Sequence, residues 1–418
     1  MFEQYYDSST RIRLLRNSPC GSLLESFSEA LYQVHYCVSR VRSHIRAAEH
    51  FIHFANRKDI AVTEVNEQLV EQFRDHQARC RCVQFRHTEP FSQVFGARLF
   101  LKHLRDTGVV TSPIVEPAHD VDVEPVLLTA FRQWMHEQRG TSDQTLHDYC
   151  VPLRVFLDRA GENPLHFNAR GLREFVVRAS RHCSPRGLQT YTTAMRAFIR
   201  FLIAEGRCAA GLEAAIPVFV HWRLASLPRY LQPDEVERII DSCDTATSSG
   251  KRDRAILLLL ARLGLRAGDI IRLRLGDIDW NEASVRVCGK GHRETRMPLT
   301  NEVGKAIVSY LKKGRPPTNS DVLFVRCVAP FHPFSSHTPV SSMVARRMYR
   351  AGVKRPIRGA AHLLRHSVAT SLLRQGVSLQ DIAAILRHRS IETTQVYAKV
   401  DIPALRQVIQ AWPEVQSC

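Results

Sequence analysis

The stretch HLLRHSVATSLLRQGVSLQDIAAILRHRSIETTQVYAKV, residues 362–400, indicates two helices followed by a polar segment. Apolar residues recur at helical spacing from Leu363 to Gln375 and from Leu379 to Leu386. Gly376, between them, favours the left-handed conformation in which many helices end. The polar run from Glu392 to Gln395 comes just before Tyr397 and predicts that this tyrosine is exposed.

The segment before this stretch changes from helical to strand periodicity. LPRYLQPDEVERII, residues 227–240, predicts a helix whose first turn contains Pro233. Lys251 to Leu263 predicts a buried helix, which begins after a polar break at Ser248 to Gly250 and ends at Gly264. Arg266 to Leu275 predicts another helix.

A β-hairpin is predicted next. Residues Ala283 to Cys288 alternate in polarity, and Glu294 to Leu299 reads as a second extended segment. The tight turn Gly289 to Gly291 lies between them and would form the tip. A last short helix, Ile402 to Trp412, is expected near the end of the chain.

The preceding half of the chain reads as two helical segments. The first runs from about Leu24 to Gly108 and the second from about Val126 to Ala215, with a proline-bearing loop, 109–124, between them. A second proline-bearing stretch, 216–229, reads as a linker. We therefore expect three domains: residues 1–110, 120–220 and 227–418.

The two helical segments resemble one another. Four apolar positions match at an offset of 102 residues, and a later group matches at 98, so that a four-residue gap in one loop reconciles the two. The pairs are Phe51 and Leu153, Phe54 and Phe156, Val70 and Leu172, Phe73 and Phe175, Phe100 and Phe198, Leu101 and Ile199, Leu104 and Leu202, and Gly108 and Gly206. Chance agreement of two amphipathic bundles is the alternative; a structural repeat is favoured.

Composition limits the class of protein. Of 418 residues, 44% are hydrophobic and 24% charged, which excludes disorder as the main state, and the 20 Gly and 20 Pro follow no collagen-like period. Lys and Arg number 58 against 41 Asp and Glu, a formal net charge of +17. A protein this basic usually faces a polyanion, with nucleic acid the first candidate and an anionic membrane surface the second.

Other global features favour the cytoplasm. Eleven cysteines, an odd number in no compact framework, fit a reducing compartment. MFEQYYDSST at the start lacks the pattern of a signal peptide, and the most apolar run, Ala255 to Leu265, is too short to span a bilayer. We expect a cytoplasmic, nucleoid-associated protein with no membrane partner.

Four motifs occur in order: LGLRAGDIIRL (263–273), GKGHRETRMPL (289–299), HLLRHSVATSLLRQG (362–376) and ILRHRSIETTQVYAKV (385–400). Together they resemble the catalytic domain of the tyrosine recombinases, the phage integrase family, over about Leu227 to Val400. The second helical segment resembles that family's core-binding domain. The implied fold is multidomain and mainly α, with two N-terminal helical bundles of SAM-like core-binding type, apparently repeated, and a mixed α+β catalytic domain with a small β-hairpin or sheet.

The resemblance implies catalytic roles for six residues. Arg266 and Arg365 would grip the non-bridging oxygens of a scissile DNA phosphate, and His388 would hydrogen-bond it. Tyr397 would attack the phosphorus, with His362 helping to move its proton, and leave a 3′-phosphotyrosine. Lys290 would protonate the leaving 5′-oxygen. The implied enzyme is a site-specific DNA recombinase of integrase or transposase type that needs no metal, ATP or other cofactor.

These residue types suit phosphoryl transfer on chemical grounds as well. The reaction needs positive groups that stabilise the negative charge on the equatorial oxygens, and an in-line nucleophile. Arginine is suited because its planar fork forms paired hydrogen bonds and stays protonated. A phenol, with a pKa of about 10, needs help to ionise, which nearby cations provide.

Further residues are expected to support the site or contact DNA. Asp269, one turn after Arg266, would orient it, and stands where the family usually has Glu. Arg387, where the family usually has Gly, adds positive charge near the phosphate. His366 is expected to be structural. The predicted DNA contacts are Arg186, Tyr191, Arg196, Arg200, Arg293, Arg296 and Arg387.

A His/Cys group at His76, Cys80, Cys82 and His87 raises the question of a zinc site. The Cys-x-Cys spacing is tighter than in the usual structural zinc finger, where at least two residues intervene. A basic surface stretch after a helix is therefore favoured, and no metal is expected.

The partners implied are double-stranded DNA and three further copies of the chain, which would pair two DNA sites as a homotetramer, with accessory or sister recombinases possible. The residues after 400 could dock on a neighbouring protomer or fold back on their own domain. The first helical segment is either an additional DNA-binding module or an oligomerisation module. Two other functions stay open: a type IB-like topoisomerase and a non-catalytic DNA-binding regulator. Resolution of chromosome dimers, phage integration and movement of a mobile element are all compatible, with the last favoured.

Overall fold

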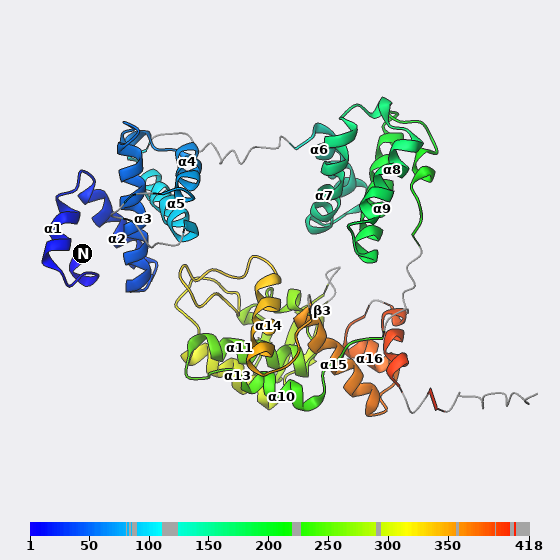
Figure 1. Ribbon diagram of the computed structural model, residues 1–418. Helices are drawn as coiled ribbons and strands as arrows, with labels where there is room; N and C mark the ends of the chain where they lie inside the picture. Colours follow the sequence, from blue (N-terminus) through cyan, green and yellow to red (C-terminus); the bar gives the residue numbers. More distant parts are fainter. Residues whose placement is uncertain are drawn as a thin grey trace, which may run out of the picture. The chain divides into compact units, whose positions relative to one another are not determined.

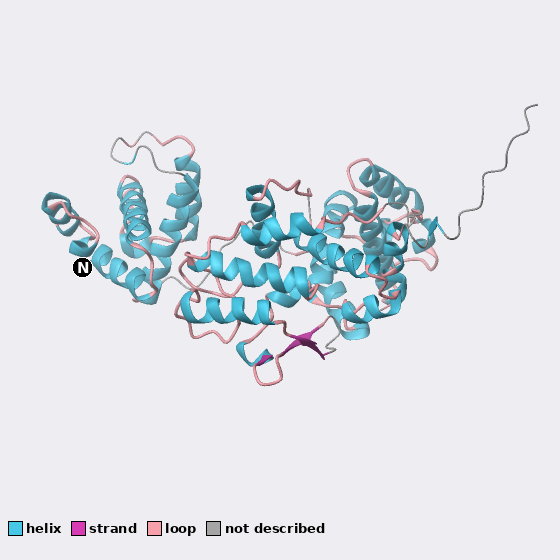
Figure 2. Ribbon diagram, turned by 90° about the horizontal axis from the view of Figure 1, so that it is seen from below, coloured by secondary structure: helices cyan, strands magenta, loops and turns pink. Residues whose placement is uncertain are grey.

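The computed structural model describes residues 1–80, 82, 85, 90–110, 124–219, 227–289, 294–356, 359–388, 390–401 and 405–406. It is mainly helical, with one small sheet (Figures 1 and 2). The chain divides into two compact units, Met1–Val62 with Phe73–Val109 and Ser226–Cys418, and Thr63–Gln72 with Val110–Ala225. Among the described residues no helix is both long and apolar enough to cross a membrane.

The first 110 residues are mainly helical. Their bounds are α1 Ser9–Arg16, α2 Gly21–Gln33, α3 Val38–Asn56, α4 Glu67–Gln77 and α5 Pro90–Asp106, with 3-10 turns at Phe2–Gln4 and Val62–Glu64. The long helix α3 packs along α5, and their buried faces carry Ile45, Phe51, Phe100 and Leu104.

The second helical group, residues 124–219, has its own apolar core. Its helices are α6 Val126–Arg139, α7 Asp143–Ala160, α8 Ala169–Ser180 and α9 Pro185–Ala204, with 3-10 turns at Pro164–His166 and Leu212–Ala215. We call α3 to α5 the first module and α7 to α9 the second module.

The two modules repeat at the level of caps and core positions. Helices α4 and α8 begin 102 residues apart, and the side chains of Asn66 and Asn168 accept hydrogen bonds from backbone N–H groups of their first turns at 3.0 and 2.9 Å. Gly108 and Gly206, just after α5 and α9, have φ of 72° and 70°. All seven predicted apolar pairs are buried, which supports the repeat.

The last region, residues 227–406, builds a larger core around α11. Its elements are α10 Pro233–Asp241, α11 Ser248–Arg262, α12 Ala267–Ile270, β1 Ile278–Asp279, β2 Ser284–Cys288, β3 Glu294–Pro298, α13 Asn301–Lys313, α14 Thr338–Arg350, α15 Ala360–Arg374 and α16 Leu379–Ile385. Two 3-10 turns follow, η7 Ile391–Thr393 and η8 Gln395–Val400. The antiparallel sheet has the order β1-β2-β3, drawn in magenta in Figure 2.

Several sequence predictions for this region are confirmed. Helix α10 begins at Pro233, and the predicted hairpin is β2 paired with β3. Gly264 and Gly376 follow α11 and α15 with φ of 60° and 82°.

Other predictions are wrong in detail. Ser248 to Gly250 is the first turn of α11 rather than a break, because the Thr247 hydroxyl caps it by accepting from the Gly250 N–H at 3.0 Å. The helix predicted from Arg266 to Leu275 has only four residues. Helices α13 and α14 and the short strand β1 were not predicted. The expected helix at 402–412 lies outside the described residues, except for positions 405 and 406.

Candidate active site

Two arginines are held by neighbouring backbone carbonyls at the end of α16. Arg266, the residue before α12, donates from Nη2 to the carbonyl oxygen of Arg387 at 3.1 Å. Arg365, buried in α15, donates to the carbonyl oxygens of Leu386 and Gly264. Carbonyls at a helix C-terminus carry partial negative charge and attract cations. The end of α16 therefore brings together two guanidinium groups that are 99 residues apart in the sequence.

A third arginine and a buried carboxylate complete this cation cluster. Asp269 is 2% exposed and accepts three hydrogen bonds, from the Arg266 backbone N–H at 3.1 Å, from Arg272 Nη2 at 3.1 Å and from Arg387 Nη2 at 2.7 Å. Asp269 thus holds the backbone of Arg266 and the side chain of Arg387.

Arg387 is buried in a strained conformation. Its side chain is 8% exposed, its φ is +53°, and its Nε and Nη1 atoms are buried with no hydrogen-bond partner among the described residues. A positive φ favours glycine, the residue that the family usually has here, so arginine adopts this conformation at a cost in backbone energy. Arg387 thus lies beside Arg266 and Arg365 as a third cation, and its contact with DNA stays a prediction.

The three cations repel one another. Burial, with further repulsion from Arg266 and Arg387, lowers the pKa of Arg365 to about 9. Burial also lowers the pKa of Arg266, and Asp269 opposes that shift. Within the described residues, Asp269 is the carboxylate that hydrogen-bonds into this cluster, so the cluster keeps an excess of positive charge. An anion with several oxygens would relieve the repulsion.

Tyr397 is buried, contrary to the exposure predicted from the preceding polar run. It is 2% exposed and lies in an apolar cluster with Leu373, Ile382 and Leu386. The reason is the 3-10 geometry of η7 and η8, in which residues three apart share a face. Thr394 and Tyr397 both point inward, while the polar residues beside them remain at the surface.

The hydroxyl of Tyr397 contacts a histidine that the sequence analysis considered structural. His366 Nδ1 lies 2.7 Å from Tyr397 Oη, and the rings meet edge to face with centroids 5.6 Å apart. His362, the residue expected to move the proton, is exposed and contacts His366 edge to face at 4.4 Å between centroids. The three rings thus form a chain from the surface to the buried hydroxyl. In the sequence, this chain of rings is indicated only by the spacing of His362 and His366, which are one helical turn apart.

His388 is fixed by a buried threonine. Its Nδ1 lies 2.7 Å from the hydroxyl of Thr394, which is fully buried. If Thr394 donates, the opposite ring nitrogen carries the proton and can donate to an anion. Thr394 was not predicted, because its role depends on the 3-10 turn.

The pKa values show which groups are neutral at pH 7. Burial, opposed by Arg365, raises the pKa of Tyr397 to about 12. Burial, with repulsion from Arg365 and Arg266, lowers the pKa of His388 to about 4. Burial, with His362 and Arg365 nearby, lowers that of His366 to about 4. The site without bound ligand therefore holds a neutral phenol and two neutral imidazoles beside the cation cluster.

The remaining candidate residues belong to the β-hairpin and to the second helical group. Lys290 and Arg293 lie outside the described residues, as does the side chain of Arg186. Arg296 on β3 is exposed, with Asp279 3.8 Å away. Three lie in the second helical group. There Tyr191 packs on Phe175, Arg196 donates to the carbonyls of Ile216 and Pro217 at 2.9 and 2.8 Å, and Arg200 is exposed.

Comparison with known proteins gives two matching families. Residues 229–402 match the phage integrase family, and residues 128–206 match the phage integrase N-terminal SAM-like domain. A putative integrase/recombinase of Sinorhizobium fredii, y4rA, is 32% identical over 94% of this chain and 95% of its own length. Tyrosine recombinase XerD of Listeria innocua is 27% identical over 68% of this chain and 96% of its own. Among solved structures, the XerH site-specific recombinase bound to a palindromic difH substrate in a post-cleavage complex matches with a TM-score of 0.55 at 17% identity, covering 81% of this chain and 93% of that one.

Proposed function

Since the chain belongs to the phage integrase family of tyrosine recombinases, which are site-specific enzymes that cleave and rejoin DNA strands, we propose that Tyr397 is its nucleophile and that the cation cluster of Arg266, Arg365 and Arg387 binds the scissile phosphate. The observation that carries the proposal is the convergence on the end of α16. There, Arg266 donates to the carbonyl of Arg387 and Arg365 to the adjacent carbonyl of Leu386, and the neutral Tyr397 lies close enough for Arg365 to influence its pKa.

Each proposed step has a group to supply its charge or proton. Tyr397 Oη attacks phosphorus while its proton passes to His366 and on toward His362. The guanidinium groups and His388 neutralise charge developing on the non-bridging oxygens. Lys290 gives a proton to the departing 5′-oxygen. The P–O bond to tyrosine replaces the P–O bond of the backbone, so a free 5′-hydroxyl can reverse the reaction without ATP.

The hydroxyl has to leave its buried position for this attack. In the free protein it bonds to His366 and lies among apolar side chains. Phosphate binding would draw it toward the cations, because a phenolate is stabilised beside guanidinium groups. The free protein would thus hold its nucleophile protected and neutral.

The remaining domains are proposed to hold the DNA. We place a core-binding domain at 120–220 and the catalytic domain at 227–418, with residues 1–110 as an additional module. The XerH neighbour is bound to DNA, and this chain's charge of +17 suits the same partner. Binding through phosphates would weaken steeply with salt. We further propose a homotetramer on paired sites, action on a mobile element and a cytoplasmic, nucleoid-associated location.

The test is recovery of covalent complexes from cells that express the gene beside its native flanking DNA. Denaturing purification of the wild-type chain should recover short DNA fragments of one sequence, and the Tyr397→Phe variant should recover none. Covalent fragments of unrelated sequence, together with relaxation of any supercoiled plasmid, would favour a topoisomerase instead. Equal recovery by both proteins would refute the nucleophile assignment.

The same fragments allow a test of the first 110 residues. Footprints of the full chain and of a chain lacking residues 1–110 are compared on the recovered site. Loss of an outer footprint supports a DNA-binding module. An unchanged footprint with loss of site pairing supports an oligomerisation module.

A further inference from the structure

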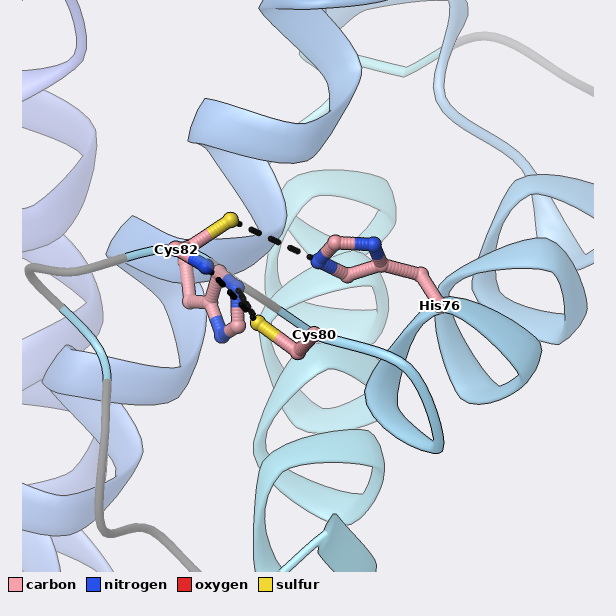
Figure 3. A group of neighbouring side chains, drawn as sticks. His76, Cys80 and Cys82 are labelled. Atoms are coloured by element: carbon pink, nitrogen blue, oxygen red, sulfur yellow. Dashed lines mark hydrogen bonds between the residues drawn. The ribbon is translucent and has the colours of Figure 1, made fainter.

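Four metal-ligating side chains meet in the first module, far from the active-site motifs in sequence. His50 comes from the middle of α3, His76 from the last turn of α4, and Cys80 and Cys82 from the connection after α4. Their ligand atoms all lie within 4.8 Å of one another. Figure 3 shows His76, Cys80 and Cys82 directed toward a common point. We propose that these four residues bind a structural zinc ion.

The spacing fits a tetrahedral zinc site. With Zn–S near 2.3 Å and Zn–N near 2.1 Å, adjacent ligand atoms of a tetrahedron are about 3.4 to 3.8 Å apart. Cys80 Sγ lies 3.5 Å from His50 Nε2, and Cys82 Sγ lies 3.6 Å from His76 Nε2. Two edges of the tetrahedron are thus already at the expected length.

The ligand set selects the metal. Two thiolates and two neutral imidazoles favour zinc over magnesium or calcium, which prefer oxygen ligands. Two thiolates also balance the charge of Zn²⁺, so the occupied site would be neutral. Neutrality suits the surroundings, because His50 is fully buried and the rings of Phe73 and Phe85 pack against it.

Neighbouring groups support the ligands in the way expected of a metal site. The side chain of Gln77 hydrogen-bonds His50 Nδ1 at 3.2 Å, which leaves Nε2 for the metal. The backbone N–H of Cys82 donates to Cys80 Sγ at 3.4 Å. Phe85 stacks on His50 with centroids 4.3 Å apart and planes 8° from parallel. Such contacts orient ligands and stabilise thiolates.

The Cys-x-Cys spacing, which argued against zinc in the sequence, is accommodated by the fold. His87, the fourth member of the group noted in the sequence, lies outside the described residues, and His50 is the fourth member of the cluster in the structure. His50 and His76 come from separate helices. The two cysteines therefore supply only two neighbouring ligands, for which a short spacing is sufficient. No local spacing pattern could reveal a ligand 26 residues upstream.

The second module is an internal control for this proposal. At the offset of 102 residues, Pro152, Arg178, His182 and Ser184 stand in place of the four ligands. The connection from α4 to α5 spans residues 78–89, whereas that from α8 to α9 spans only 181–184. The ligands therefore coincide with a longer connection, and metal bound in the folded state would offset the entropy cost of closing it.

The test measures zinc in the full-length chain without an affinity tag. The chain is supplied with zinc sulfate, freed of loose metal by gel filtration and analysed by mass spectrometry. Wild-type protein should retain about one zinc per chain, as a closed four-ligand site requires. The Cys80→Ser and Cys82→Ser variants should retain at least tenfold less. Cys183→Ser, which removes a half-buried thiol from the second module, should match the wild type.

A second measurement covers variants that fail to fold. Wild-type protein stripped by a chelator is titrated with Co²⁺, whose visible bands report geometry and whose near-ultraviolet band reports thiolate ligation. Intense tetrahedral bands with a sulfur-to-metal charge-transfer band support the proposal. Wild-type protein that retains no more zinc than Cys82→Ser, or a Co²⁺ spectrum without the charge-transfer band, overturns it. Neither readout depends on recombination, so this proposal can fail while the proposed function stands.

Discussion

The cation cluster around Asp269 and the His/Cys cluster of the first module suit ligands of opposite charge. In the first, three guanidinium groups are forced together and only partly neutralised by one carboxylate and by carbonyls. In the second, two thiols and two imidazoles converge beside aromatic rings, with hydrogen bonds between them at 3.5 and 3.6 Å. The first cluster is complementary to an anion and the second to a soft cation. The excess charge of one cluster and the converging ligand atoms of the other thus indicate the kind of ligand that each would bind.

The largest expected effect is at the cation cluster. Arg365→Ala removes the buried guanidinium that bonds the carbonyls of Gly264 and Leu386. We expect single-turnover cleavage of the recovered DNA site to fall by about 10³-fold or more, since fixed charges at the transition state are among the strongest catalytic terms. Arg374→Ala, on the same helix but bonded to the Tyr230 hydroxyl, is the control and should cleave normally. Equal cleavage rates for the two variants would show that Arg365 has no role in cleavage.

The proposed zinc site in the His/Cys cluster predicts a local change in stability. Removing metal with a chelator should raise amide hydrogen exchange about a hundredfold in α3 to α5, because local opening would no longer break metal–ligand bonds. The equivalent helices α7 to α9 serve as the internal reference and should not change. A uniform change of exchange in both modules, or no change in either, would contradict a metal site confined to the first module.

Arg387 offers a smaller and more specific test. Arg387→Gly removes one cation and also relieves the positive φ, a strain of about 1 kcal/mol. We expect cleavage about tenfold slower with unchanged or higher thermal stability. Arg387→Ala keeps the strain and should be equally slow but less stable than the glycine variant. A glycine variant as active as wild type would show that the third cation is not needed.

The pH profile tests whether the site is neutral before DNA binds. His366 and His388 have pKa values lowered to about 4, so both are neutral and should add no inflection to the cleavage rate between about pH 6 and 8. Tyr397, with its pKa raised to about 12, is almost entirely protonated there and gives its proton to neutral His366 during attack, so the rate should change little with pH in this range. An inflection near pH 6.5 that disappears in His366→Gln would show that this histidine titrates in its ordinary range.

The effect on stability has a definite sign. Below pH 6.5 the unfolded chain protonates these histidines, whereas the folded chain does so only near pH 4. Folding is therefore disfavoured progressively as the pH falls through this window. The midpoint temperature of unfolding should drop between about pH 6.5 and 4, and less steeply in His366→Gln.

The sequence predicted those parts of the site that depend on residue type and order. The ordered motifs singled out Arg266, Arg365, His388 and Tyr397. The structure shows the hydrogen bonds that hold each side chain, and their catalytic roles stay predictions. It did not predict the burial of Tyr397, because a polar run looks exposed unless its 3-10 geometry is known.

The fold was predicted in the same uneven way. Repeated apolar spacing predicted the two modules, and alternation predicted the hairpin, since both are local patterns. The ligand His50 and the pairing of Arg387 with Asp269 were missed, because each joins residues brought together only by tertiary packing.

The central claim is that the hydroxyl of Tyr397 attacks phosphorus beside the cation cluster. The most direct measurement is mass spectrometry of the covalent complex after digestion of protein and DNA. The account predicts that the tryptic peptide of residues 390–399 carries a nucleotide remnant on Tyr397, and that no adduct forms with Tyr397→Phe. A remnant on any other residue, or an adduct formed equally by the phenylalanine variant, would contradict it.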